Sequence, residues 1–312
     1  MKRKVFDAEF IRKYGILMVL VIMWVIMLAV SPTFRTVSNA VNILRQVAVN
    51  GILAIGMTFV IMTGGIDLTV GSLVAVAGVI SGSILVVHPE QVILAVLAGI
   101  VVCGLFGAMN GFFVAYMEVP AFVATLAGMT IARGFAYVYS DGKPYTLNSP
   151  KFRIIGQGMA PIIIFLAILL ICHIVLSKMK FGRYIYATGG NIKAAEASGV
   201  NTKKILMKVY ILAGTLSGIA GIVLASRTNS GQPAVGTGFE TDAIAAAVIG
   251  GTSMTGGIGT IPGTLVGILI IGTLNNSLNL LNVSSYYQQI IKGIIILGAV
   301  CFDIEIGRAS CR

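Results

Sequence analysis

Long apolar segments recur along almost the whole chain and constrain its fold more than any other feature. A helix needs about 20 apolar residues to cross the core of a bilayer, and lipid offers no hydrogen-bond partners to irregular backbone. Charged residues make up 11% of the 312 residues, whereas a soluble domain carries about a quarter. The sequence therefore predicts an all-α, polytopic integral membrane protein of about ten transmembrane helices in a single domain, residues 1–304. The expected spans are 15–30, 44–63, 69–87, 91–116, 120–139, 159–177, 206–226, 241–250, 260–281 and 286–303.

Glycine pairs interrupt two of these apolar segments. Gly64-Gly65 follows the second span, and Gly250-Gly251 follows the short eighth span. Irregular backbone at membrane depth is tolerated where it is buried in protein or lines a cavity, so we expect broken or re-entrant helices near 64–68 and 241–258. The stretch 60–72 also resembles 248–257 followed by 263–265. This echo indicates either an internal repeat, which many transporters contain, or a chance match between glycine- and threonine-rich sequences.

Basic residues are distributed unevenly between the connecting segments. The first 14 residues are basic, and we interpret the apolar run after them as a first span rather than a cleaved signal. Counting spans from a cytoplasmic N-terminus places 178–205 inside and 140–158 outside. Six basic residues lie in the inner segment, namely Lys178, Lys180, Arg183, Lys193, Lys203 and Lys204, and three in the outer one, Lys143, Lys151 and Arg153. This excess inside follows the positive-inside rule, so the net charge of +11 indicates contact with anionic lipid rather than nucleic acid.

The final eight residues differ in character from the rest. Their sequence, EIGRASCR, resembles a read-through translation of a common DNA-sequencing adapter. We therefore expect 305–312 to be a non-native tail and leave it out of the expected fold.

The longest polar interruption of the apolar pattern is the loop at 178–205. It contains an alanine-rich run, 193–198, between Gly190 and Gly199. About six residues of helix are too few to be stable alone in water, and small side chains let another backbone approach closely. The pattern predicts a short helix near 192–199, ended by Gly199 in a left-handed conformation and presented to another protein.

Five motifs in this order resemble one known family. They are Thr63-Gly-Gly-Ile-Asp-Leu-Thr-Val-Gly71, Pro120-Ala-Phe-Val-Ala-Thr-Leu126, Tyr186-Ala-Thr-Gly-Gly-Asn191 with Ala194-Ala195 and Ser198-Gly199-Val200, Phe239-Glu-Thr-Asp-Ala-Ile-Ala-Ala-Ala247, and Ile249-Gly-Gly-Thr-Ser-Met-Thr-Gly-Gly257. Together they resemble the permeases of bacterial ABC sugar importers of the ribose type, and the likeness spans nearly the whole chain.

The resemblance implies a multi-pass protein of the bacterial inner membrane that works as a homodimer. It also implies ATP-binding subunits inside the cell and an extracytoplasmic sugar-binding protein outside. The residues expected to couple the permease to the ATPase are Asn191, Ala194, Ala195, Glu196 and Gly199. Ribose is the expected sugar, while xylose, galactose, inositol and autoinducer permeases are close relatives.

Four residues are candidates for a substrate path: Asp67, Thr69, Asn275 and Asn279. An acid inside a membrane segment often has a functional role, although Asp67 is also placed to cap the helix that restarts after Gly65. Asn275 and Asn279 share one helix face, from which Asn276 turns away. Their amides suit either sugar hydroxyls or hydrogen bonds between helices.

Four further charged residues fall in or beside the expected spans. Arg133 and Lys292 are expected either to extend toward the membrane interface or to pair with a buried acid. Glu240 and Asp242 are expected in the first turn of the eighth span, where the helix dipole favours negative charge.

Motifs of several other protein classes are absent from the sequence. It lacks the G-x-x-x-x-G-K-[ST] loop of a nucleotide site and the HExxH motif of a metalloprotease. The four cysteines form no ligand or disulfide pattern. We therefore expect no enzyme activity, cofactor or metal in this chain. The alternative to an ATP-driven permease is an ion-coupled secondary transporter, which usually buries several charged residues; Asp67 is nearly the only acid expected at such a depth.

Overall fold

The computed structural model describes residues 2–310, with the side-chain environments of 15–298 and 300–301. Its first half contains α1 (Lys2–Val30), η1 (Thr33–Arg35), α2 (Val37–Met62), α3 (Val70–Val87), α4 (Val92–Ala115), α5 (Ala121–Tyr139), β1 (Tyr145–Thr146) and α6 (Pro150–Gly156). Its second half contains α7 (Ala160–Lys178), α8 (Lys180–Gly190), α9 (Ile192–Ala197), α10 (Thr202–Thr228), β2 (Ser230–Gly231), α11 (Phe239–Ile249), α12 (Ile261–Leu280) and α13 (Ser285–Ser310). The all-α prediction is confirmed, with one two-residue antiparallel pair, β1–β2, among the described residues.

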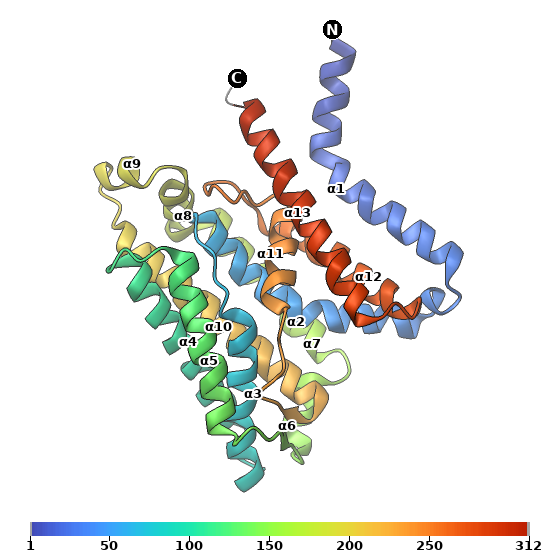
Figure 1. Cartoon of the computed structure of the whole chain (residues 1–312), viewed down its shortest axis with the longest axis vertical. Coiled ribbons are helices and arrows are strands. Elements are labelled where there is room, and N and C mark those ends of the chain that lie inside the picture. Colours follow the sequence, from blue (N-terminus) through green and yellow to red (C-terminus); the bar gives the residue numbers. More distant parts are fainter. Residues whose placement is uncertain (1, 311–312) are drawn as a thin grey trace.

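The centre of the bundle is formed by α2, α3 and α10, and α4 packs along α10 (Figure 1). Residues 47–49 and 51–62 of α2 are all buried, so this helix is apolar on every side, as expected of a helix enclosed by others. Glycines let α4 and α10 approach: a Cβ at Gly107 would overlap the Tyr210 carbonyl oxygen. The outer sides of α4, α5 and α7 expose large apolar side chains, which suits lipid.

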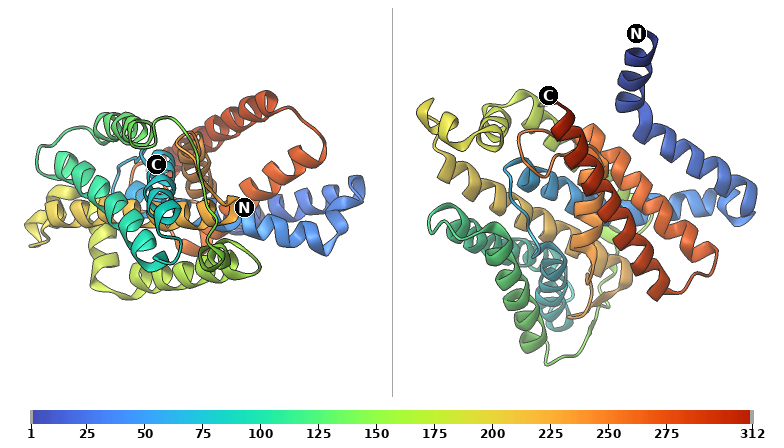
Figure 2. Two further views of the ribbon diagram at one scale, coloured as in Figure 1. Left: turned by 90° about the horizontal axis from the view of Figure 1, so that it is seen from below. Right: turned by 45° about the horizontal axis from the view of Figure 1, so that its top comes forward.

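Each of the ten expected spans coincides with a helix. Within the described residues, seven helices are long and apolar enough to cross a membrane, and Gly15–Val30 forms a shorter apolar helix. The 11 residues of α11 measure about 16 Å at 1.5 Å per residue, roughly half of a hydrocarbon core. The count of ten crossings therefore stays a prediction. Both described ends of the chain lie at the end of the molecule that carries α8 and α9 (Figures 1 and 2), which agrees with an even number of crossings.

The two expected interruptions are confirmed as breaks between helices. The chain leaves α2 after Met62 and resumes helix at Val70, and it leaves α11 after Ile249 and resumes at Ile261. Glycines provide the turns, with φ of 77° at Gly64 and 87° at Gly251, a region that disfavours other residues. The two loops touch, because the Gly257 amide donates a 2.9 Å hydrogen bond to the Met62 carbonyl. Re-entrance into the membrane and an internal repeat stay predictions.

The structure also contains elements that the sequence analysis did not predict, among them the short η1. A short helix, α6, lies in the 140–158 segment, β1 pairs with β2, and α8 precedes the expected short helix. The expected non-native tail continues α13 as far as Ser310, and residues 311–312 lie outside the described part. Side chains of the basic N-terminal residues 2–13 lie outside it as well.

Candidate functional site

The expected short helix exists as α9, and a polar side chain begins it. Asn191 is extended, with φ of −161°, and its side-chain oxygen accepts a 3.0 Å hydrogen bond from the Ala194 amide. This bond satisfies one of the amides that every helix leaves free at its start. Asn191 also separates α9 from α8, so two short helices meet here and form what we call the α8–α9 pair (Figure 1).

The end of α9 has the geometry of a Schellman motif. Gly199 has φ of 82°, and its amide donates to the Glu196 carbonyl at 2.9 Å. The next amide, of Val200, donates to the Ala195 carbonyl at 3.0 Å. These two bonds satisfy carbonyls that the helix end would leave free. The prediction that Gly199 ends the helix in a left-handed conformation is therefore confirmed.

The two central alanines of α9 face different ways. Ala195 is 4% exposed and packs inside the chain, so it does not lie on the surface that a partner would reach. Ala194 and Ala197 are exposed, as is Ile192. The Glu196 carboxylate accepts a 2.5 Å hydrogen bond from the Thr202 hydroxyl, which ties α9 to the start of α10. The exposed surface of α9 is thus small and partly apolar, and all six basic residues of 178–205 are exposed around it.

The α8–α9 pair contacts both interruption loops. The Tyr186 hydroxyl donates a 2.6 Å hydrogen bond to the Gly259 carbonyl, and partial burial raises the pKa of Tyr186 above its usual value. Gly189 lies so close to Met62 and Gly257 that a Cβ there would overlap the Met62 carbonyl oxygen. A displacement of α8 therefore acts directly on the loops before α3 and before α12.

Asp67 and Thr69 lie in a closed polar cluster at the start of α3. Both are fully buried, and the Asp67 carboxylate accepts from the amide and the hydroxyl of Thr69 at 2.9 and 2.5 Å. Asn110 donates to the Thr69 hydroxyl at 3.2 Å, and Thr125 donates to the Ile66 carbonyl at 3.1 Å. These bonds favour a structural role for Asp67, since it holds the backbone just before the helix. Within the described residues, Asp67 Oδ2 and Asn110 Oδ1 have no hydrogen-bond partner, and neither Asp67 nor Thr69 lines the polar cavity described next.

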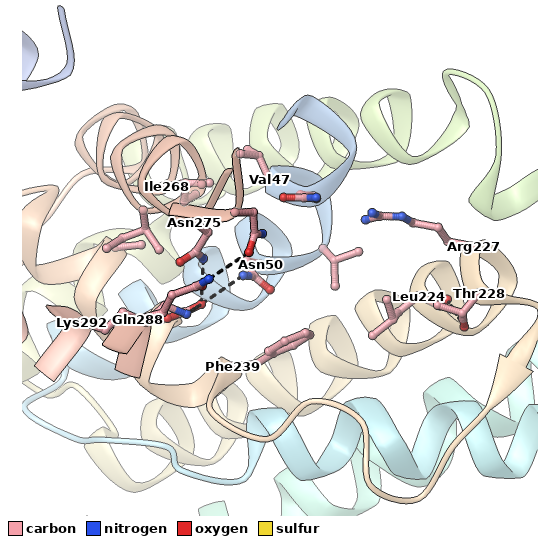
Figure 3. Close-up of a pocket in the computed structure, with 17 residues that line it drawn as sticks. Val47, Asn50, Leu224, Arg227, Thr228, Phe239, Ile268, Asn275, Gln288 and Lys292 are labelled. Carbon is pink, nitrogen blue, oxygen red and sulfur yellow. Dashed lines mark hydrogen bonds and ion pairs between the residues drawn. The ribbon is translucent and has the colours of Figure 1, made fainter. Parts of the chain in front are cut away.

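A polar cavity of about 360 Å³ lies between α2, α10, α11, α12 and α13 (Figure 3). We call it the Asp242 cavity. Its polar lining consists of Gln46, Asn50, Arg227, Thr228, Asp242, Asn275, Asn279, Gln288 and Lys292. Phe239, Val47 and Leu224 are among its apolar residues. α10 starts beside α9 and is about 40 Å long. Arg227 and Thr228 lie at its far end, so the cavity lies toward the face opposite the α8–α9 pair.

One carboxylate oxygen of Asp242 collects the cavity's polar contacts. It accepts from Lys292 at 3.0 Å, from the Asn275 amide at 3.2 Å and from the Asn50 amide at 3.5 Å. The side chains of Asp242 and Lys292 are 5% and 24% exposed. Figure 3 shows these contacts as dashed lines. Four helices, α2, α11, α12 and α13, are thus joined at a single acid.

The path candidates therefore separate into two groups. Asn275 and Asn279 line the Asp242 cavity, whereas Asn276 points away and exchanges hydrogen bonds of 3.1 and 3.0 Å with Asn39. Asn275 bonds to another helix, as the second interpretation of the asparagines expects, while binding of sugar hydroxyls stays a prediction. Sequence analysis missed Gln46, Asn50 and Gln288, which are ordinary polar residues until the fold brings them together.

The charged residues beside the spans take the following places. Glu240 and Asp242 lie in the first turn of α11, as predicted. Lys292 pairs with a buried acid, which was one of its two expected arrangements. The Arg133 guanidinium donates to the Pro233 and Val235 carbonyls, both at 2.7 Å, and fixes the irregular segment before α11; its extension toward the membrane interface stays a prediction.

A bundle of apolar helices with two glycine-loop interruptions is the architecture of a polytopic membrane protein. Residues 39–300 match the family described as the branched-chain amino acid transport system / permease component. The chain belongs to this family and is a multi-pass protein of the bacterial inner membrane, with seven helices in its described part that are long and apolar enough to cross a bilayer.

Several full-length relatives are named after their transport substrates. The chain is 44% identical over 310 residues to the ribose import permease of Escherichia coli K12, covering 96% of each chain. It is 45% identical over 309 residues to the ribose import permease of Bacillus subtilis 168, covering 97% of this chain and 95% of the relative. It is 39% identical over 296 residues to an L-arabinose transport system permease of Escherichia coli K12, covering 93% and 90%. No solved structure matches the chain.

Proposed function

We propose that the chain is the membrane subunit of an ATP-driven ABC importer for a monosaccharide, ribose or a close relative. The full-length similarity carries this proposal: identity is 44–46% to ribose import permeases and 36–39% to L-arabinose permeases. One of the latter, from Azospirillum brasilense, is named as part of an ABC transporter. The family description names amino acids, but these relatives match almost the whole chain and are named after pentoses.

In the proposed assembly, two copies of the permease bind ATP-binding subunits at the face that carries the α8–α9 pair. ATP hydrolysis then takes place in those separate subunits. An extracytoplasmic sugar-binding protein docks on the opposite face.

The contact with the ATPase is formed by exposed residues of α9, namely Ile192, Ala194 and Ala197. The bonds described above for Asn191, Glu196 and Gly199 hold α9 in shape. Ala195 supports this surface from inside the chain.

The fold suggests how a movement of the ATPase reaches the sugar. Tyr186 and Gly189 contact the loops at 62–64 and 256–259. Three helices extend from these loops to the Asp242 cavity: α2 with Asn50, α11 with Asp242 and α12 with Asn275. A shift of the α8–α9 pair therefore moves three of the four helices that meet at Asp242.

The proposal is tested by sugar uptake into vesicles that contain the purified permease and ATPase, with the binding protein outside. We expect D-ribose uptake that requires ATP inside the vesicles and persists when ionophores collapse all ion gradients. Uptake that proceeds without ATP and stops with the ionophore would instead establish the ion-coupled transporter.

The ATPase contact is tested separately with Ala194→Trp. This substitution adds bulk to the exposed side of α9 and leaves its caps intact. Co-purification with the ATPase should be lost, while the membrane fold and dimer persist. Unchanged co-purification would show that α9 is an ordinary surface helix.

A further inference from the structure

We propose that the Asp242 cavity is a monosaccharide-binding subsite on the transport path, open when the permease faces the binding protein. This inference rests on the proposed function and names the site within the permease that receives the sugar. The cavity, its polar lining and its position in the fold each support it.

The polar lining suits a ligand with many neutral hydroxyls. Five carboxamides face the cavity: Gln46, Asn50, Asn275, Asn279 and Gln288. Each carboxamide has both donors and an acceptor, as each sugar hydroxyl does. The Asn275 Oδ1 atom is buried and has no hydrogen-bond partner within the described residues. Such an unsatisfied oxygen costs free energy, and because the atom is buried from solvent, a sugar hydroxyl donates to it only after the Asn275 amide rotates toward the cavity.

The centre of the lining is neutral, while the lining as a whole has one further cation, Arg227, whose guanidinium donates to the Arg45 carbonyl. Asp242 and Lys292 pair at 3.0 Å and neutralise each other. Phe239, Val47 and Leu224 supply apolar wall area, against which the C–H face of a sugar ring can pack. The volume of about 360 Å³ lies within the range of roughly 300–1,000 Å³ found for small-molecule sites.

The position of the cavity fits delivery from one side and control from the other. Arg227, Thr228 and Asn279 lie at or near the ends of their helices on the face opposite the α8–α9 pair. Asp242 and Ala246 belong to α11, which leads toward the interruption loop at 250–260. A sugar released on the opposite face therefore reaches Asp242 before it meets the loops that the α8–α9 pair contacts.

Occupancy can be measured by thiol protection in the full transporter complex in nanodiscs, with D-ribose as the probe. Asn279→Cys places a thiol at the exposed rim of the cavity. The background replaces Cys301 and Cys311 with serine, and Cys103 and Cys172 are buried. With D-ribose at about ten times its Kd, labelling by a polar thiol reagent should fall about tenfold, because roughly one site in ten stays empty. Asn148→Cys, exposed in the 140–149 segment, should label at the same rate with and without ribose.

Two neighbouring asparagines separate a binding role from a structural one. In the Asn279→Cys background, Asn275→Ala should raise the half-protecting ribose concentration by about three- to tenfold, as expected for lost hydrogen bonds to a neutral group. Asn276→Ala should leave that concentration unchanged while lowering the melting temperature, because Asn39 loses its partner.

Failures of the two proposals are distinguishable. Equal labelling with and without ribose, in a complex that takes up ribose with ATP, overturns the subsite and leaves the proposed function standing. Equal loss of protection in Asn275→Ala and Asn276→Ala also overturns it, since the effect would then be structural. A complex that transports no sugar with ATP overturns the proposed function, whatever the labelling shows.

Discussion

The α8–α9 pair and the Asp242 cavity are built in opposite ways. The pair is continuous in sequence, and its shape depends on local features: an asparagine side chain that caps α9, a left-handed glycine and a glycine pressed against the Met62 carbonyl. The cavity is assembled from side chains of helices far apart in sequence, joined at one charged group. Substitutions that change the backbone shape should therefore be poorly tolerated in the α8–α9 pair. Substitutions that change the charge should be poorly tolerated in the Asp242 cavity.

The difference also assigns the two regions different tasks. A rigid, capped surface element suits the transmission of a displacement, because it moves as a unit. Polar side chains held by a single acid can exchange partners, because amides rotate and a sugar hydroxyl can replace an amide donor. The glycine loops between the two regions connect them through close backbone contacts.

The largest effect is expected from a charge removed in the cavity. Asp242→Ala leaves the partly buried Lys292 without its partner, which should lower the free energy of unfolding by about 3 kcal/mol, near the lower end for broken buried pairs because Lys292 keeps some solvent. Chemical or thermal unfolding in detergent measures this loss. The double variant Asp242→Asn, Lys292→Met removes both charges and keeps an acceptor for Asn50, so most of the stability should return.

An exposed ion pair provides the control for this variant. Asp141 and Lys143 lie 2.9 Å apart with side chains 88% and 78% exposed, and exposed pairs contribute little. Lys143→Ala removes this pair and should leave the melting temperature unchanged; it is preferred to a change at Asp141, whose φ of 52° alanine disfavours. If Lys143→Ala destabilises as much as Asp242→Ala, the charge at Asp242 is no more important than one at the surface.

The next effect is expected from a change of shape at the α8–α9 pair. Gly189→Ala forces a methyl group against the Met62 carbonyl, a type of overpacking that costs about 1–3 kcal/mol. A cost of about 1–3 kcal/mol corresponds to a roughly ten- to hundredfold fall in ATP-driven uptake. Gly190→Ala is the matched control, since a Cβ there meets nothing within 4 Å. Similar uptake in both variants would show that the contact with the loops is dispensable.

Local sequence accounts for most of the helices and for the α8–α9 pair. Apolar length predicts the spans, glycine pairs predict both interruptions, and the run from Asn191 to Gly199 predicts α9 with its left-handed end, because these signals act over a few neighbouring residues. The preceding helix α8 was not predicted, and its glycines Gly182 and Gly189 are residues that weaken a helical signal. In the structure these glycines instead allow close contact with Leu176 and Met62.

The Asp242 cavity could be predicted only in part. Asn275 and Asn279 were found because they are conspicuous on an apolar helix, whereas Gln46, Asn50 and Gln288 give no local signal. Asp67 drew attention as an isolated acid, yet its bonds with Thr69 are local and support the start of α3. A site that depends on four helices meeting at one side chain requires the fold.

The third prediction concerns Gly199, whose left-handed conformation ends α9. It tests whether binding of the ATPase requires this conformation. Gly199→Val places a β-branched residue at φ of 82°, which should destabilise this end by about 1–2 kcal/mol. Binding of the ATPase, measured by co-purification, should weaken. Gly199→Asn should bind nearly as well as the parent, because asparagine accepts left-handed geometry at helix ends. Normal binding by the valine variant would mean that the cap is not needed.

The smallest effect is expected at the hydrogen bond between the α8–α9 pair and the loop before α12. Tyr186→Phe removes the hydroxyl that donates to the Gly259 carbonyl at 2.6 Å and keeps the ring, so the loss should be about 1 kcal/mol. Gly189 still presses on the Met62 carbonyl in this variant, so the pair should stay in place and uptake should fall only a few-fold. ATPase activity stimulated by the binding protein, compared with uptake in the same vesicles, measures how much hydrolysis is still coupled. If Tyr186→Phe impairs coupling as strongly as Gly189→Ala, the hydrogen bond rather than the backbone contact transmits the movement, and the α8–α9 pair depends on a side chain in the way the cavity does.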